Sequence, residues 1–440
     1  MASDKSGALD TSLSSDNEAL PVPREKQPGA GGEESPHLVN AANALTFCLM
    51  VLSCFFSSVL VKYIGIKAAL IFGTIGYAPY AAGLYCNNRY GNEWLVLLGA
   101  ALCGISAGVF WMAEAAIALS YPEPENQGRF LGLWLSFRVA GQVLGGVINL
   151  ALNADNSGKG KVSYNVYLVF IALQALGPFA ALLLTPPEKV QRTDGVIPNL
   201  RISESSWREI KLTSKLFISK YFLLLVPVIA QGVYSEAVMF TYESVWLSVR
   251  GRALGSFLSG IVAMISGNLL GAFLDREKWS LKKRARWSFI VILGLQGVWW
   301  IWGTVLVTNY WGQNPLPVYD WTDGGAFVRT FLLFLGWVSG FQLNYLFLYF
   351  LVGNLAKTPE EVVRIAALLR GTESAVQAVS YGLNSITVMG DIGGVYLNFG
   401  LWGLALIPGW LLVKEIGVSL GIARLRGRGK LLKDREERDS

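Results

Sequence analysis

The chain has 440 residues, of which 52% are hydrophobic and only 15% charged, a balance that a soluble domain of this length could hardly keep in solution. Its net charge of +6 comes from basic residues in short loops between apolar stretches, which argues against a nucleic-acid surface. The single histidine, His37, lies in a polar segment, so histidine metal sites, catalytic triads and proton relays lack their residue. We therefore expect an integral membrane protein in contact with lipid, with no enzyme activity, cofactor, metal or nucleic-acid partner.

Polar and apolar segments alternate regularly along the chain. Residues 1–39 carry proline, glycine and scattered charges with too few apolar residues for a core, so we expect a disordered tail without a cleaved signal peptide. Apolar segments of about 20 residues, the length that crosses a bilayer as a helix, follow. They run at about 41–61, 68–86, 94–120, 130–152, 163–185, 218–241, 253–275, 287–307, 326–354, 362–389 and 398–420. This pattern predicts eleven membrane-spanning helices.

A polar stretch divides these segments into two groups. Five spans occupy residues 40–185, a connector follows at 186–217, and six spans occupy 218–420 before a basic tail at 421–440. Five spans plus six is the pattern of two six-helix repeats of which the first helix is missing, a plan found in many secondary transporters. The sequence thus predicts an all-α, polytopic membrane bundle with two pseudo-repeat halves.

Basic residues indicate which loops share a compartment. The loop at 276–286 holds six Lys or Arg residues, whereas the loop at 308–325 holds none and carries Asp320 and Asp323. Because cytosolic loops are enriched in Lys and Arg, we assign the 276–286 loop, the connector and the C-terminal tail to the cytosol. This pattern does not distinguish the plasma membrane from internal membranes.

Ionisable side chains inside the predicted spans are the first candidates for function. A charge inside the bilayer is costly, so each such group should face a partner or a watery cavity. Glu114 and Arg138 lie at similar depths in consecutive antiparallel spans, so they can pair. Such a pair either lines a solute or proton pathway or simply ties the two helices together.

Glu373 lies near mid-membrane in its predicted span. There a carboxyl group kept neutral by its surroundings could exchange a proton, which makes Glu373 the best candidate for proton coupling. Arg370 stands one turn away and could instead hold Glu373 ionised, in which case the two residues form a structural pair. The sequence leaves both alternatives open.

Other polar residues also fall within the spans. They are Gln142 in the first half and Gln231, Glu236, Gln342 and Asn344 in the second. Side chains of this kind are suited to line a solute cavity, and hydrogen bonding between helices is the alternative.

Aromatic residues form two clusters in the second half. These are Trp299, Trp300 and Trp302, and the pair Tyr345 and Tyr349. Both clusters could stack on an aromatic ligand. Anchoring at the lipid headgroups is the favoured interpretation, because Trp and Tyr are enriched at membrane interfaces.

Several short segments point to a known family. The segments at 40–45 and 61–67 resemble the second helix and following turn of major facilitator transporters, more specifically of the uncoordinated-ninety-three-like branch in its fungal form. The likeness continues through residues 104–111, 120–122, 320–323 and 370–375 and covers nearly all of 40–420. The chain departs from the family in lacking a helix before Asn40 and in having Glu114 and Glu373 where glutamine is expected. The resemblance implies the major facilitator fold.

The resemblance also implies a gate at the cytosolic helix ends. In related transporters charges at these ends lock the closed gate. The matching positions here are Lys62 and Lys67 in the first half and Asp275 and Arg276 in the second. The first-half loop has no acidic partner of its own for its two lysines.

Two functions are compatible with this resemblance. The leading one is alternating-access transport of a small organic solute, with proton coupling through Glu373 as an added hypothesis. The alternative is a non-transporting accessory or trafficking protein that binds and regulates a partner membrane protein, because fold transfers between relatives better than function does.

Overall fold

The computed structural model describes residues 36–421 apart from 124, 154–163, 193–199, 201–204 and 277. Nearly all of the two predicted tails, 1–39 and 421–440, lies outside these residues. The described residues form helices and turns, with isolated bridges but no strand. The elements are α1 (Pro36–Thr74), α2 (Tyr77–Tyr90), α3 (Glu93–Ser120), α4 (Gln127–Asn153), α5 (Tyr164–Ala175), α6 (Gly177–Leu182), η1 (Pro187–Lys189), α7 (Ser206–Phe217), α8 (Lys220–Trp246), α9 (Val249–Leu274), α10 (Leu281–Trp311), η2 (Trp321–Asp323), α11 (Gly325–Leu355), α12 (Pro359–Asn384), η3 (Met389–Gly393) and α13 (Gly394–Val413).

Eight helical stretches of the described residues are long and apolar enough to cross a membrane. One of them, Ala41–Tyr90, is 50 residues long, more than twice the length that one crossing needs. α12 is long enough at 26 residues but more polar, and α5 with α6 forms a shorter apolar run. Once the long stretch is divided and these two are added, each of the eleven predicted segments is helical.

Gly65 divides the long stretch. Its φ of 77° is a left-handed conformation that glycine adopts without strain, and it separates two helices within α1. At the other end of the chain the predicted bounds of the last span are wrong, because helical backbone begins with η3 at Met389 and ends at Val413. Glycine has low helix propensity, but backbone within the membrane must still satisfy its own hydrogen bonds.

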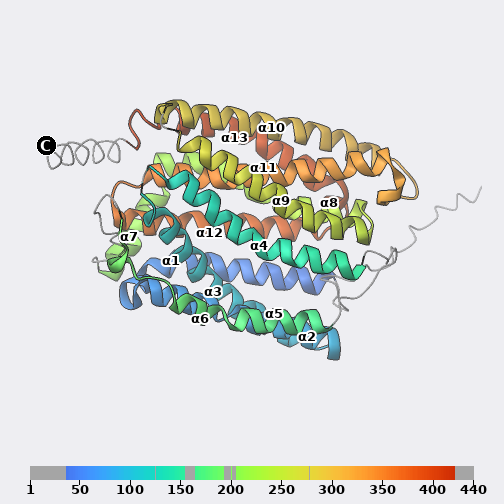
Figure 1. Cartoon of the computed structure of the whole chain (residues 1–440), viewed down its shortest axis with the longest axis horizontal. Helices are drawn as coiled ribbons and strands as arrows, with labels where there is room; N and C mark the ends of the chain where they lie inside the picture. The colour runs from blue at the N-terminus through green and yellow to red at the C-terminus, as the bar shows by residue number, and fades with distance from the viewer. Residues whose placement is uncertain are drawn as a thin grey trace, which may run out of the picture.

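The helices run side by side along the long axis of the molecule (Figure 1). α1, α2, α3, α5 and α6 form one group and α8, α9, α10, α11 and α13 another, while α4 packs against α9 and α12 packs against α1. Glycine permits the close approach of α4 and α9. A Cβ at Gly128 would lie 2.6 Å from the carbonyl oxygen of Gly271, and a Cβ at Gly146 would lie 2.7 Å from the backbone nitrogen of Phe257.

α7 marks one end of the bundle, which we call the connector end (Figure 1). The largest buried apolar cluster lies toward this end and includes residues of both halves, among them Leu119 and Leu131 from the first half and Leu351 and Val363 from the second. The remaining clusters each belong to one half. The apolar core therefore joins the two halves toward the connector end.

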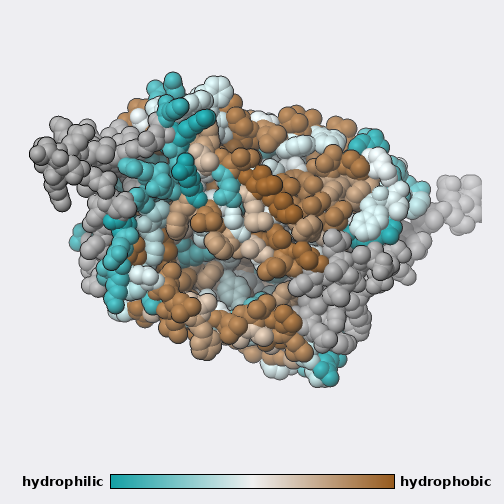
Figure 2. Space-filling model, in the orientation of Figure 1, coloured by the Kyte–Doolittle hydropathy of each residue, from teal (hydrophilic) through white to brown (hydrophobic). Residues whose placement is uncertain are grey.

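One face of the molecule shows how the surface is divided. Hydrophobic side chains cover its middle, and hydrophilic side chains gather toward both ends, as a bilayer would require (Figure 2). Between the upper and lower groups of helices this face is hollowed, and paler, more polar side chains are visible at the bottom of the hollow (Figure 2). The interior of the bundle is thus more polar than its outer surface.

Candidate functional site

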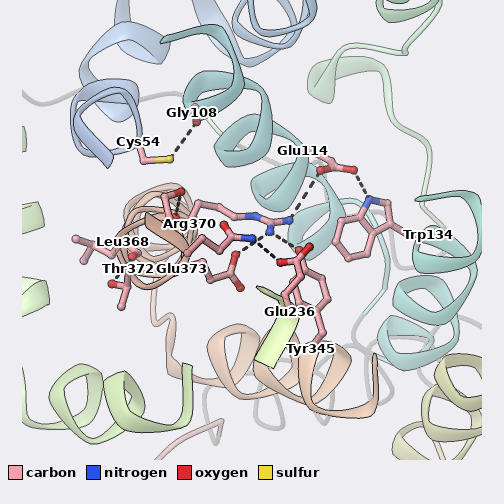
Figure 3. A network of polar contacts seen from close by, with 12 residues as sticks. Cys54, Gly108, Glu114, Trp134, Glu236, Tyr345, Leu368, Arg370, Thr372 and Glu373 are labelled. Atoms are coloured by element: carbon pink, nitrogen blue, oxygen red, sulfur yellow. Dashed lines mark hydrogen bonds and ion pairs between the residues drawn. The ribbon is translucent and has the colours of Figure 1, made fainter. Parts of the chain in front are cut away.

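A buried arginine forms the centre of the candidate site. Arg370 on α12 lies 2.8 Å from a carboxylate oxygen of Glu373 and 3.9 Å from one of Glu114, and it donates a hydrogen bond to the hydroxyl of Tyr345. Figure 3 shows its side chain pointing from α12 toward Glu114 on α3 and Tyr345 on α11. The ion pairs therefore join the two halves of the bundle in its interior.

Aromatic rings surround this guanidinium. Its central carbon lies 4.8 Å from the ring centroid of Trp111, 5.3 Å from that of Tyr345 and 5.2 Å from that of Tyr349, within the range of cation–π attraction. Trp134 on α4 donates a hydrogen bond of 2.9 Å to Glu114. Trp111 and Trp134 were not among the predicted site residues, because aromatic residues in spans usually serve packing or anchoring.

The predicted anchoring of the aromatic clusters at lipid headgroups is wrong for three residues. Tyr345 is 3% exposed, Tyr349 0% and Trp300 2%. Both tyrosines stack in the interior with Trp134, and Trp300 stacks on Trp337 at 4.8 Å. Enrichment of Trp and Tyr at interfaces is an average tendency, and here a buried cation supplies a stronger attraction for the tyrosines.

Arg138 does not form the ion pair with Glu114 that similar depth in consecutive helices suggests. Its guanidinium lies over the rings of Tyr345 at 4.3 Å and Trp111 at 5.0 Å. Glu114 instead contacts Arg370 and Trp134. Depth along the helix axis fixes only one coordinate, and the rotation of α4 directs Arg138 toward α11.

Glu373 has the partner named in the second of the two predicted alternatives. Arg370 pairs with it at the i, i+3 spacing of α12. The other carboxylate oxygen of Glu373 is buried without a hydrogen-bond partner, and so is one oxygen of Glu114. One guanidinium is thus shared by two carboxyl groups, each of which keeps an unsatisfied oxygen.

The polar residues of the second half join helices to one another. Gln231 on α8 donates to Asn344 at 3.1 Å and to Gln296 at 3.4 Å. Gln377 on α12 donates to Glu236 on α8 at 2.6 Å. Sequence reasoning missed Gln296 and Gln377, whose only signal was amide polarity within an apolar span.

Two predicted pathway residues lie apart from this network. Gln342 is buried against Gly267 of α9, with its amide nitrogen unsatisfied. The side chain of Gln142 is outside the described part of the chain. The arrangement in the second half is that of interhelical hydrogen bonding, the alternative to a cavity lining.

Asp275 joins the two halves at the connector end. Its carboxylate accepts hydrogen bonds from the backbone N–H groups of Gly128 and Arg129, at 2.7 and 2.6 Å, in the first turn of α4. These N–H groups have no partner within their own helix and carry the positive end of its dipole. Burial raises the pKa of the Asp275 carboxyl, while the two hydrogen bonds favour its ionised form.

The predicted gate residues Lys62, Lys67 and Arg276 form no ion pair with any described residue. Asp275 therefore takes its partner from a helix terminus rather than from a side chain. This explains how a first-half loop without acidic residues can still be joined to the second half.

A second contact at the connector end is a buried ion pair that sequence reasoning missed. Arg364 on α12 donates two hydrogen bonds, of 2.8 and 2.7 Å, to Glu209 on α7. The Glu209 side chain is 0% exposed and that of Arg364 8%. Nearby, the Tyr63 hydroxyl is hydrogen-bonded to Ser206 at 2.7 Å. α7 is thus attached to α1 of the first half and α12 of the second.

At the opposite end the ionic contact stays within one half. Arg250 forms a two-point hydrogen-bonded pair with Asp320, which also accepts a hydrogen bond from Ser248 at 2.6 Å. The Arg250 guanidinium holds the pKa of Asp320 well below its usual range. Asp320 also caps η2, so the segment 320–323 has a structural role in this loop.

Comparison with known proteins agrees with this architecture. The sequence profile of the Major Facilitator Superfamily matches residues 31–319. The chain belongs to the major facilitator superfamily.

Within the superfamily the chain is similar to UNC93-like proteins. It is 26% identical over 393 residues to an UNC93-like protein of Schizosaccharomyces pombe, covering 88% of this chain and 76% of that protein. It is 39% identical over 394 residues to the notoamide biosynthesis cluster protein O' of Aspergillus versicolor, covering 90% of this chain and 85% of the relative. The predicted family is therefore confirmed.

Solved structures share the fold. The chain superposes on the proton:xylose symporter XylE with a TM-score of 0.62 at 12% sequence identity, covering 88% of this chain and 89% of that one. At this identity the likeness shows the fold alone. The predicted all-α bundle of major facilitator type is confirmed, and the major facilitator transporter fold is that of this superfamily member.

Proposed function

We propose that this major facilitator protein transports a small organic solute by alternating access. The observation that carries the proposal is the interior cluster of Arg370, Glu114 and Glu373, which joins α3 of the first half to α12. Charges are costly inside a bilayer and are retained there where they serve a pathway. Their position between the two halves is where the solute site of a rocking transporter lies.

The contacts at the connector end support this mechanism. Solute release toward that end requires the Asp275 contacts with α4 and the Glu209–Arg364 pair to loosen, because each contact bridges elements that must separate. Loosening exposes polar groups to water at a helix end, where they can be solvated. We infer that the structure represents the state closed at the connector end.

The orientation follows from charge. The connector end carries the basic loop at 276–286, so we infer that it faces the cytosol. The solute site is then open toward the opposite side in this state. The compartment on that side is a question for localisation of the tagged protein.

Proton coupling is a further part of the proposal. Protonation of Glu373 would break its charge pairing with Arg370, and Arg370 would then interact mainly with Glu114. That change shifts the attraction from α12 toward α3 of the first half. A single proton can in this way alter the contact between the two halves.

The class of solute is suggested by one relative. The Aspergillus versicolor protein is named for a biosynthesis cluster. Small organic molecules are the products of biosynthesis, so we infer a solute of that class for this chain. The aromatic residues around Arg370 and Arg138 suit such a molecule better than an inorganic ion.

The experiment compares small molecules inside and outside cells that lack the gene, carry it, or carry Glu373→Gln. The exposed residue Glu93 supplies the matched control, Glu93→Gln. A solute whose gradient returns with wild type and Glu93→Gln but not with Glu373→Gln supports the proposal. The solute is then tested for uptake into liposomes containing the purified protein.

Two outcomes contradict the proposal. Undiminished proton-driven uptake by Glu373→Gln removes proton coupling through this residue. A solute profile that is unchanged by deletion of the gene favours the accessory function, which is then tested by the surface abundance of membrane proteins in the deletion strain.

A further inference from the structure

Arg138 differs from the other arginines of the interior. Arg364 and Arg370 each form an ion pair and donate hydrogen bonds. Arg138 is only partly buried, and none of the described residues forms an ion pair or a hydrogen bond with it. Its contacts are with the rings of Trp111 and Tyr345.

The carboxyl groups near Arg138 are already engaged. Glu114 accepts a hydrogen bond from Trp134 and faces Arg370. Glu236 accepts one from Gln377. Both attract the charge of Arg138 without contacting it. The five N–H groups of its guanidinium therefore remain available to a ligand.

An arginine in this position is costly unless a partner reaches it. A charge in the interior of a membrane bundle faces a partner or water. Ring contacts at 4.3 and 5.0 Å hold the guanidinium in place but satisfy none of its N–H groups. A planar carboxylate matches the fork of these N–H groups with two parallel hydrogen bonds, which a neutral ligand cannot do equally well.

The surroundings also specify what the carboxylate is attached to. Trp134 lies 6.4 Å from Tyr345, nearly parallel to it, and 5.0 Å from Tyr349. Trp111 stands on the other side of Arg138. Flat aromatic side chains bind flat rings by offset stacking and bury much apolar area in doing so.

We propose that Arg138 is the anchor for the solute, and that the solute is an organic anion with a carboxylate on a flat, unsaturated ring system. This inference rests on the proposed transport function, which leaves the solute class open. The anion adds a negative charge to a site that already holds three carboxyl groups. Uptake of a proton by one of them offsets this charge, so the solute and the proton move together.

Binding to the purified full chain in lipid nanodiscs tests the inference by calorimetry. The probes are 2-naphthoate and cinnamate, each compared with its neutral amide. We expect at least one carboxylate to bind wild type at least tenfold more tightly than its amide. Arg138→Gln should lose at least tenfold in affinity for that carboxylate, because it removes the charge and the fork.

Two further variants control for folding and charge. Arg138→Lys keeps the charge without the planar fork, so its affinity should lie between those of wild type and Arg138→Gln. Arg329→Gln removes an exposed cation of α11 and should bind as wild type does. Equal binding of acid and amide, unchanged affinity in Arg138→Gln, or no binding by either carboxylate overturns the inference.

Liposome counterflow separates this inference from the proposed function. If a carboxylate binds through Arg138 but is never moved across the membrane, the transport proposal fails and the anion site stands. If the solute found by profiling is transported but is neutral or cationic, the anion site fails and transport stands.

Discussion

The ion pair between α7 and α12 gives a quantitative prediction for Glu209→Gln. Loss of one partner of a buried pair costs about 3–5 kcal/mol, because the other charge stays buried. Glu360 and Glu361 lie just before Arg364 on α12 and still attract its charge. We therefore expect the lower end of the range, about 3 kcal/mol. At about 1.4 kcal/mol per tenfold change, α7 should leave its site about 100-fold more often.

Thiol labelling measures this opening. Thr213 lies on α7, is 0% exposed, and its hydroxyl has no hydrogen-bond partner among the described residues. Thr213→Cys therefore places a hidden thiol at little cost, in a background where Cys48→Ala and Cys86→Ala remove the two thiols that are not buried. Adding Glu209→Gln should raise the labelling rate about 100-fold if opening limits the reaction.

Two controls test the reasoning. Lys211→Gln removes an exposed charge of the same helix and should leave the labelling rate near that of the parent. Replacement of both partners, Glu209→Leu with Arg364→Met, should restore slow labelling, because no buried charge remains. An unchanged rate in Glu209→Gln would refute the view that this pair holds α7 in place.

Two other predictions concern stability. The Arg250 guanidinium lowers the pKa of Asp320, so the pair stabilises the protein above the ordinary carboxyl pKa of about 4, and this contribution is lost as pH falls through the lowered pKa. Thermal unfolding should thus show Asp320→Asn below wild type at neutral pH, with the two converging in strong acid. Gly271→Ala should destabilise the protein by about 1–3 kcal/mol, since its Cβ would meet the Gly128 carbonyl, whereas Gly267→Ala should have little effect because its nearest contact, with a Gln342 side chain, is at 3.7 Å. Equal melting temperatures for these two glycine variants would contradict the packing described for α4 and α9.

Much of the fold follows from sequence because the bilayer sets helix length. Every predicted span is helical, including α12, whose charges lower its hydropathy. The bounds of the last span were less accurate, since Met389–Gly393 is rich in glycine and yet continues the helical backbone. The domain boundaries of the two tails stay a prediction, because those residues lie outside the described chain.

Pairings between side chains were harder to predict. Rise along a helix gives the depth of Glu114 and Arg138 but not the direction in which each side chain points. Arg370 lies more than 250 positions from Glu114 in the sequence, and only packing of α12 against the first half brings them together. The close pair Arg370 and Glu373 was predictable, because i, i+3 neighbours share one face.

The connector was read as polar chain, and so the role of Glu209 was missed. A signal was present in the serine cap at Ser205 followed by apolar residues at helical spacing, which is typical of an amphipathic helix. Nothing in the sequence indicated that a carboxylate on this helix would be fully buried. Its partner Arg364 comes from a helix 155 residues further along.

The glycine contacts between α4 and α9 limit how this molecule can move. Backbone meets backbone near the connector end, at Gly128 and Gly271, and again toward the other end, at Gly146 and Phe257. Two rods that touch at both ends can roll on one another, but neither can slide or tilt without a clash. This seam is therefore the axle of any rocking motion, and a disulfide placed across its middle should leave that motion intact.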